Sequence, residues 1–241
     1  MKTKSILGLA ATCLIMGNMA FATVITPSYK TWGPLAGATF GGTGIPNNPV
    51  AATTEIVNGN DTITLGLTAT QRYFNPTVGN DGAGTFFATP GANYGTPATP
   101  TTPGTPSLAQ GPTWNFDWYI NLADNTTAGY SYALLYGNNT TGASTLLSFG
   151  SASNTSGTWQ DSWNLSMGFL NTISFDPNAN GVYGFELQAF DAAGKMLGET
   201  AINVNVSSSV PDAASSTLLL GLGLGSLLLL GYRQNRLAIT K

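Results

Sequence analysis

Residues 114–122 alternate, position by position, between large apolar side chains and mostly polar ones. The apolar members are Trp114, Phe116, Trp118, Ile120 and Leu122. A two-residue period places one kind of side chain on each face of an extended strand, and it does not fit the 3.6-residue period of a helix. The segment therefore predicts a β-strand with one face in an apolar core.

The same alternation recurs in residues 183–189 and, after a turn, in residues 196–206. The turn is Asp191-Ala192-Ala193-Gly194, with glycine where a left-handed backbone is common, so the two segments predict a β-hairpin. Its second arm is expected to turn one face to the core, comprising Met196, Thr200, Ile202, Val204 and Val206. Further strands are predicted over 63–67 and 130–136. Short strands of this kind predict an all-β domain, an antiparallel β-sandwich or a jelly-roll-like fold.

Two stretches interrupt the strand pattern. Residues 89–112 are dense in Thr, Pro and Gly, and proline lacks the amide donor that a sheet needs, so a long surface loop is predicted there. In residues 161–170, Trp163, Met167 and Leu170 fall at helical spacing behind Asp161, which could cap a helix. One short helix is predicted in this stretch.

The composition excludes several classes of function. The chain has no histidine, which removes Ser-His-Asp and Cys-His catalysis and imidazole metal sites. Eight Lys and Arg residues against eleven Asp and Glu residues cannot form the basic surface that nucleic acid requires, so no nucleic-acid partner is expected.

The first 22 residues have the three parts of a secretory signal peptide. Lys2 and Lys4 precede a mostly apolar run over residues 6–16, and Ala20 and Ala22 provide the small residues of a cleavage site. We expect export through the Sec translocon and cleavage by signal peptidase after Ala22; the alternative is an uncleaved anchor. The single cysteine, Cys13, lies in this segment, so the mature chain would contain no disulfide.

The last 32 residues have the features of a membrane-inserted tail. Val210, Pro211 and Asp212 precede residues 213–232, which are almost entirely Leu, Gly, Ala and Ser. Twenty helical residues at about 1.5 Å each span roughly the 30 Å core of a bilayer. Arg233 and Arg236 follow and would act as the membrane stop on the cytoplasmic side. A simple C-terminal anchor would have the same features.

This combination of a short proline motif, a glycine-rich apolar helix and a terminal arginine cluster resembles the PEP-CTERM family of sorting domains, in its VPD-type variant. The resemblance covers about the last thirty residues. It implies a Gram-negative host, recognition at Val210, Pro211 and Asp212, and processing by an exosortase, a membrane-embedded protease. Since Val-Pro-Asp replaces the Pro-Glu-Pro that gives the family its name, the exosortase subtype and the cut position stay open. Members of the family are associated with exopolysaccharide.

These features predict three parts: a signal peptide (1–22), an exported β-sandwich domain (23–209) and a sorting domain (210–241). The expected function is that of a non-enzymatic protein, held briefly in the inner membrane and then deposited at the cell surface or in the extracellular matrix. No catalytic residue, cofactor or metal site is assigned. The turn sequences 80–82 and 176–178 each supply one carboxylate and are interpreted as Asx turns rather than calcium sites.

Two alternatives remain. In the first, the exported domain binds carbohydrate, including exopolysaccharide, through Trp32, Trp159 and Tyr119, whose rings would stack on sugar faces. The second, more distant alternative is a secreted glycoside hydrolase, in which Asp117 and Glu186 would face one cleft.

Overall fold

The computed structural model describes residues 24–40, 45–73, 75–93, 111–123, 129–147, 157–170 and 173–208. Several predicted features lie outside the described residues: the cleavage residues Ala20 and Ala22, the motif Val210, Pro211 and Asp212, the helix 213–232, the stop residues Arg233 and Arg236, and residues 94–110 of the predicted loop. Within the described ranges, no helix combines the length and hydropathy needed to cross a bilayer.

The described chain is all-β and forms two sheets. The first sheet is antiparallel throughout and has the order β1-β2-β3-β6-β9, namely β1 (Thr31–Pro34), β2 (Val50–Asn58), β3 (Asp61–Gln71), β6 (Trp114–Ala123) and β9 (Gly157–Trp163). The second has the order β4-β5-β11-β10-β7-β8, namely β4 (Gly79–Asn80), β5 (Thr85–Ala88), β11 (Met196–Val206), β10 (Gly181–Phe190), β7 (Ser131–Asn138) and β8 (Ala143–Leu147). Only the β5–β11 pair is parallel among these described strands.

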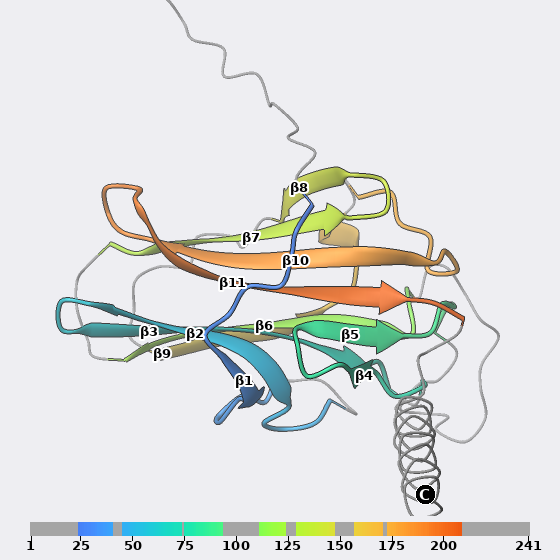
Figure 1. Cartoon of the computed structure of the whole chain (residues 1–241), viewed down its shortest axis with the longest axis horizontal. Helices are drawn as coiled ribbons and strands as arrows, with labels where there is room; N and C mark the ends of the chain where they lie inside the picture. The colour runs from blue at the N-terminus through green and yellow to red at the C-terminus, as the bar shows by residue number, and fades with distance from the viewer. Residues whose placement is uncertain are drawn as a thin grey trace, which may run out of the picture.

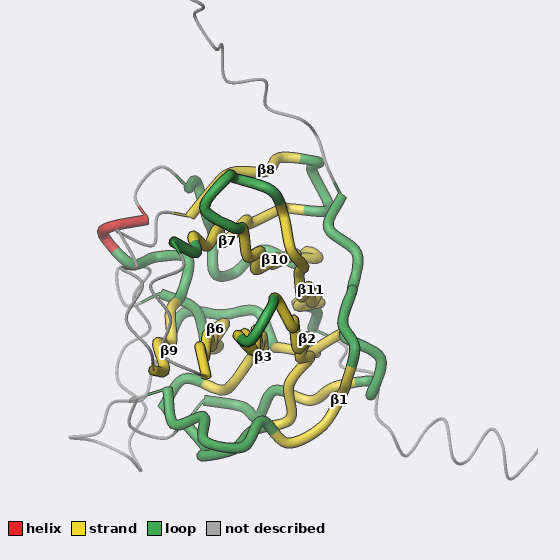
Figure 2. The backbone as a smooth tube through the Cα atoms, turned by 90° about the vertical axis from the view of Figure 1, so that its left-hand side faces the viewer, coloured by secondary structure: helices red, strands yellow, loops and turns green. Residues whose placement is uncertain are grey.

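The two sheets face each other across one apolar core, and the two layers are seen end-on in Figure 2. The alternating residues of β6 provide one wall of this core and those of β10 the other. At its centre the rings of Phe116 and Phe185 stack with their centroids 4.2 Å apart. Trp114, fully buried, packs edge-on against Phe185. Burial of such rings is the main favourable contribution to a fold that has no disulfide among its described residues.

The predicted hairpin is confirmed. Strands β10 and β11 pair from Gly181 with Val206 to Phe190 with Met196, and Gly194 in the turn has φ +79°. The predicted orientation of Met196 is wrong: its side chain is 47% exposed. The register shifts at Ala189/Phe190, which leaves Leu197 without an opposite residue, and this bulge reverses the alternation next to the turn. Leu197 packs against the core in its place.

The predicted helix over 161–170 is also wrong. Asp161 and Trp163 belong to β9, and helical structure is limited to a 3-10 turn, η2 (Gly168–Leu170). Asp161 does not cap a helix; its carboxylate accepts hydrogen bonds from the Ser162 amide (2.8 Å) and from Nε1 of Trp163 (2.8 Å). Pairing with Phe116 across the β6–β9 ladder fixes Trp163 in the core. A long-range contact thus overrides the local helical spacing.

The predicted loop 89–112 is described only at its two ends, and these ends meet. Ala92 bridges to Pro112, and the Asn93 amide donates to the Gly111 carbonyl at 2.8 Å. Both ends therefore lie at the start of β6, where residues 111–113 lead into Trp114.

The N-terminal segment 24–30 crosses the outer face of the second sheet before it reaches β1 (Figure 1). Ile25 is buried there, and the Asn139 side chain binds both its amide (3.0 Å) and its carbonyl (2.6 Å). Ser28 then forms a two-bond bridge with Ala201 of β11. The segment ties the second sheet to the first, since the Lys30 amide already donates to Thr53 of β2.

Candidate functional site

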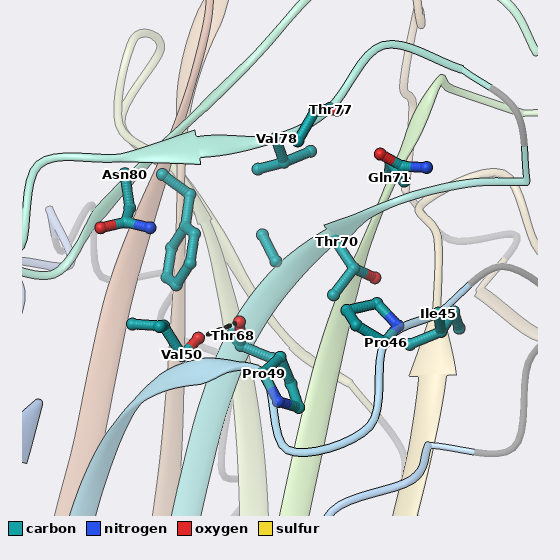
Figure 3. Close-up of a pocket in the computed structure, with 12 residues that line it drawn as sticks. Ile45, Pro46, Pro49, Val50, Thr68, Thr70, Gln71, Thr77, Val78 and Asn80 are labelled. Carbon is teal, nitrogen blue, oxygen red and sulfur yellow. Dashed lines mark hydrogen bonds between the residues drawn. The ribbon is translucent and has the colours of Figure 1, made fainter. Parts of the chain in front are cut away.

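A pocket of about 470 Å³ opens where β3 runs past the first residue of β2. Figure 3 shows its lining, which is drawn from the segment before β2, the end of β3 and the β4–β5 region. The lining residues are Ile45, Pro46, Pro49, Val50, Thr68, Ala69, Thr70, Gln71, Thr77, Val78, Asn80 and Phe86. The volume lies in the range of small-molecule sites.

Among the described residues, the lining contains no charged side chain, and several of its polar groups are already engaged in hydrogen bonds. The Thr68 hydroxyl donates to the Val50 carbonyl at 2.7 Å, as Figure 3 shows. Nε2 of Gln71 donates to the Tyr73 carbonyl (3.3 Å), and Oδ1 of Asn80 accepts the Gly82 amide (3.2 Å). The pocket therefore suits an uncharged ligand with apolar surface.

Thr68 and Thr70 also belong to a group of buried polar side chains on the outer face of the first sheet. In the β3–β6 ladder Thr68 pairs with Asp117 and Thr70 with Asn115, and in the β6–β9 ladder Asp117 pairs with Ser162. All of these side chains are buried, and Asp117 is 0% exposed. We call Thr70, Asn115, Asp117 and Ser162 the Asp117 cluster. Opposite residues on neighbouring strands have their Cβ atoms about 5 Å apart, so Thr70 on β3 and Ser162 on β9 flank Asn115 and Asp117 of β6 from its two sides.

Within the described residues, the Asp117 cluster leaves several buried oxygens without a hydrogen-bond partner. These are both carboxyl oxygens of Asp117, Oδ1 of Asn115 and Oγ1 of Thr70. Inside the cluster, Nδ2 of Asn115 donates to the Ser162 hydroxyl at 2.9 Å. Buried polar atoms are normally satisfied, so a group of unsatisfied acceptors requires an explanation.

Burial raises the pKa of Asp117 from 3.8 to about 7. The hydroxyls of Ser162 and Thr70 lie close enough to favour the carboxylate and moderate this rise, although neither completes a hydrogen bond of ordinary geometry. The nearby charge of Asp161 raises the pKa further. Desolvation is the largest cause, because a carboxylate removed from water loses its solvation.

The structure separates the three candidate sugar-stacking residues. Trp32 lies on β1 and Trp159 on β9, at opposite edges of the first sheet. Each is half-buried: Trp32 contacts Phe86 with ring centroids 5.3 Å apart, and Trp159 contacts Tyr132 at 6.1 Å. Tyr119 is only 6% exposed, because Leu35, Ala38 and Phe40 pack over it. Tyr119 is therefore inaccessible to a sugar face, and the three rings form no common platform.

The two carboxylates considered for hydrolysis do not share a cleft. Asp117 projects from the outer face of the first sheet, since its neighbours Phe116 and Trp118 point into the core. Glu186 projects from the outer face of the second sheet, between the core residues Phe185 and Leu187. Burial raises the pKa of Glu186, and so does its neighbour Glu199 on β11. The whole core lies between Asp117 and Glu186.

The two turn sequences form Asx turns. Oδ1 of Asp81 accepts the amides of Ala83 (2.7 Å) and Thr85 (3.0 Å), and Oδ1 of Asp176 accepts the amide of Asn178 (2.9 Å). Within the described ranges, no group of three or more acidic or cysteine side chains is placed to share a metal ion.

Sequence reasoning did not identify the Asp117 cluster. The alternation in β6 places Asn115 and Asp117 on one face, but it does not reveal that this face is covered. Thr70 and Ser162 lie on other strands, and only the register of the two ladders brings them beside Asp117.

Comparisons of the chain with models of protein families, with curated proteins and with solved structures found no match. The chemistry of the site is therefore inferred from its own geometry.

Proposed function

We propose that this chain is an exported, non-enzymatic protein that an exosortase-type system sorts to the cell surface or extracellular matrix of a Gram-negative bacterium. The tail carries the proposal: Val210, Pro211 and Asp212, the apolar residues 213–232, and then Arg233 and Arg236. A resident helix would hold the chain in the inner membrane while the motif stays within reach of a membrane protease.

The position of the described fold supports this division. The first strand begins at Thr31 and the last ends at Val206, so the two sheets fall inside the predicted exported domain 23–209. The ladder between β10 and β11 reaches its last described pair at Gly181 with Val206, before the motif begins. We take the two facing sheets to be a β-sandwich of jelly-roll-like type. The separation of Asp117 from Glu186 supports a function without hydrolysis.

The decisive experiment compares the terminal peptides of the protein in a host with the candidate exosortase and in the same host without it. Mass spectrometry is expected to find an N-terminus at Thr23 in both hosts and a C-terminus near Val210 only when the exosortase is present. A mature chain that still ends at Lys241 in both hosts would instead identify a plain membrane anchor. A reporter fused to residues 210–241 alone serves as control and is expected to fractionate with membranes.

A second candidate function, carbohydrate binding on the same export route, has one specific observation in its favour. Trp32 is half-exposed and contacts Phe86, which lines the uncharged pocket. An aromatic face beside neutral amide and hydroxyl groups is suited to an uncharged sugar. The expected partner is a neutral segment of exopolysaccharide, because the described residues carry three basic side chains against nine acidic ones.

The Trp32→Ala variant tests this second function, with Trp159→Ala as the matched control. Both residues are half-buried tryptophans on edge strands of the same sheet. In a pull-down with purified neutral polysaccharide, Trp32→Ala is expected to lose binding and Trp159→Ala to retain it. Equal losses would indicate general destabilisation, and no binding by the wild-type chain would remove this function.

A further inference from the structure

The Asp117 cluster combines the ligand types of a hard cation in one buried place. Asp117 offers two carboxyl oxygens, Asn115 an amide oxygen, and Thr70 a hydroxyl, and none of these atoms has a hydrogen-bond partner in the described part of the chain. Ser162 adds a second hydroxyl, whose oxygen already accepts from Nδ2 of Asn115. Oxygen-only sets of carboxylate, amide and hydroxyl groups bind Ca²⁺, whereas they suit zinc or copper poorly.

No basic side chain of the described residues neutralises Asp117. Lys30 and Lys195 are exposed. Arg72 lies on the same face as Thr70, but its Nη1 points toward the loop at Gly111: a Cβ built on Gly111 would meet Nη1 of Arg72 at 3.1 Å and Oδ1 of Asn164 at 2.5 Å. A buried carboxylate without a counter-charge is costly, and it must take up either a proton or a cation.

We propose that Thr70, Asn115, Asp117 and Ser162 form a binding site for a hard cation, with Ca²⁺ as the ion of choice. Ca²⁺ accepts irregular sets of six to eight oxygens, including a bidentate carboxylate, while Mg²⁺ demands a near-octahedral shell and keeps its waters. With one carboxylate, the site belongs with weak extracellular modules, whose Kd is about 10⁻⁴ to 10⁻³ M.

The pocket borders this site at Thr70. Thr70 belongs both to the cluster and to the pocket lining, and Thr68, the register partner of Asp117, lines the pocket beside it. The uncharged pocket is therefore the side from which an ion would approach. This inference concerns the folded domain alone, and its test does not depend on whether the chain is exported or sorted.

The test uses the full-length chain, purified with a mild detergent, stripped with EDTA and dialysed at pH 8. Thermal unfolding is followed with CaCl₂, MgCl₂ or NaCl at matched ionic strength. Tb³⁺, a Ca²⁺ surrogate, is titrated in parallel, with its luminescence excited through the tryptophans. Trp114, Trp118 and Trp163 adjoin Asn115, Asp117 and Ser162 in the sequence and are the nearest donors along the chain.

We expect 10 mM Ca²⁺ to raise the Tm by roughly 5 °C, more than Mg²⁺ or Na⁺ does, and to displace Tb³⁺. Asp117→Asn should raise the Ca²⁺ concentration needed for the Tm shift and for Tb³⁺ displacement at least tenfold. Asn115→Asp adds a second carboxylate, so it should tighten Ca²⁺ binding at least tenfold. Asp81→Asn and Asp176→Asn, at the two Asx turns, are the matched controls and should respond like the wild type.

Three results would overturn the site. The first is a wild-type chain with neither a Tm response nor Tb³⁺ luminescence. The second is an Asp117→Asn variant that binds as the wild type does. The third is loss of binding in either Asx-turn variant, which would assign the ion to a surface turn instead. If Asp117→Asn fails to fold, Asn115→Asp tests the site instead. Tighter Ca²⁺ binding in Asn115→Asp, with unchanged binding in the two Asx-turn variants, supports the site, and unchanged binding in Asn115→Asp overturns it.

Discussion

Ile25 lies directly over Gly184 on the outer face of the second sheet: a Cβ built on this glycine would come within 2.5 Å of the Ile25 Cβ. Gly137, the register partner of Gly184 on β7, leaves a similar space, since its Cβ would approach Ile25 at 3.2 Å. The two glycines form a notch in which the N-terminal segment rests. If signal peptidase cuts after Ala22, the new terminus begins two residues before Ile25.

Gly184→Ala should displace the N-terminal segment, because the added methyl group would overlap the main part of the Ile25 side chain rather than a flexible end. Overpacking of this kind costs about 1–3 kcal/mol in the free energy of unfolding. Gly79→Ala is the matched control: Gly79 also lies in a strand, and no atom of the described residues comes within 4 Å of its Cβ position. Urea unfolding of both variants measures the effect, and equal stabilities would contradict the notch.

Asn139→Ala should loosen the same segment, because it removes both side-chain hydrogen bonds to the Ile25 backbone. We expect a loss of about 1–2 kcal/mol and faster hydrogen exchange at residues 24–28. Asn121→Ala is the control, since its amide also makes a side-chain hydrogen bond, to Thr158 at 2.8 Å, but far from the segment. Unchanged hydrogen exchange at residues 24–28 in Asn139→Ala would show that Asn139 does not hold this segment.

Tyr130→Phe should destabilise the fold. The Tyr130 hydroxyl donates to Oδ2 of Asp61 at 2.6 Å and accepts from Nδ2 of Asn58 at 3.1 Å, so its removal takes one hydrogen bond from the buried Asp61 carboxylate and one from the half-buried Asn58 amide. Loss of a hydrogen bond to a charged group costs about 1.5–3 kcal/mol. Tyr132→Phe is the matched control, because the Tyr132 hydroxyl has no partner among the described residues and burial raises its pKa to about 12. Chemical denaturation should show a loss in the first variant and none in the second.

Asp117→Asn should change how stability depends on pH. With its pKa near 7 in the fold and 3.8 as the ordinary value, the native chain holds a proton between these pH values that the unfolded chain has lost. The free energy of unfolding therefore falls as pH rises from about 4 to 7, by on the order of 4 kcal/mol, and levels off above pH 7. The neighbouring charges are Asp161, which raises this pKa, and Arg72, whose Nη1 lies beside Gly111.

Urea unfolding at pH 4.5, 6 and 8, with EDTA present, measures this effect as the difference between the two proteins. Asn cannot titrate, so Asp117→Asn should gain stability relative to the wild type as pH rises. Parallel pH profiles would show that Asp117 is ionised in the fold at low pH. Glu186 titrates in both proteins, so its own raised pKa cancels in the difference.

The strand pattern was predictable because alternation is a local property of extended backbone. It identified the apolar faces of β6 and β10 and the hairpin around Gly194. It failed at Met196, where one inserted residue reverses the alternation, and at Trp163, whose pairing with Phe116 overrides a helical spacing. Neither the bulge nor the pairing can be read from the segment itself.

The sequence by itself determined the all-β class, which side of each main strand faces the core, and the absence of histidine chemistry and of a basic surface. Tertiary structure alone decided what covers the outward-facing side of each strand. Tyr119 and Asp117 alternate with core residues and were expected on open faces, yet both are buried. A two-residue period specifies which face a side chain joins. Whether another layer packs on that face depends on segments distant in the sequence, such as residues 35–40, and on the register that places Thr70 and Ser162 beside Asp117.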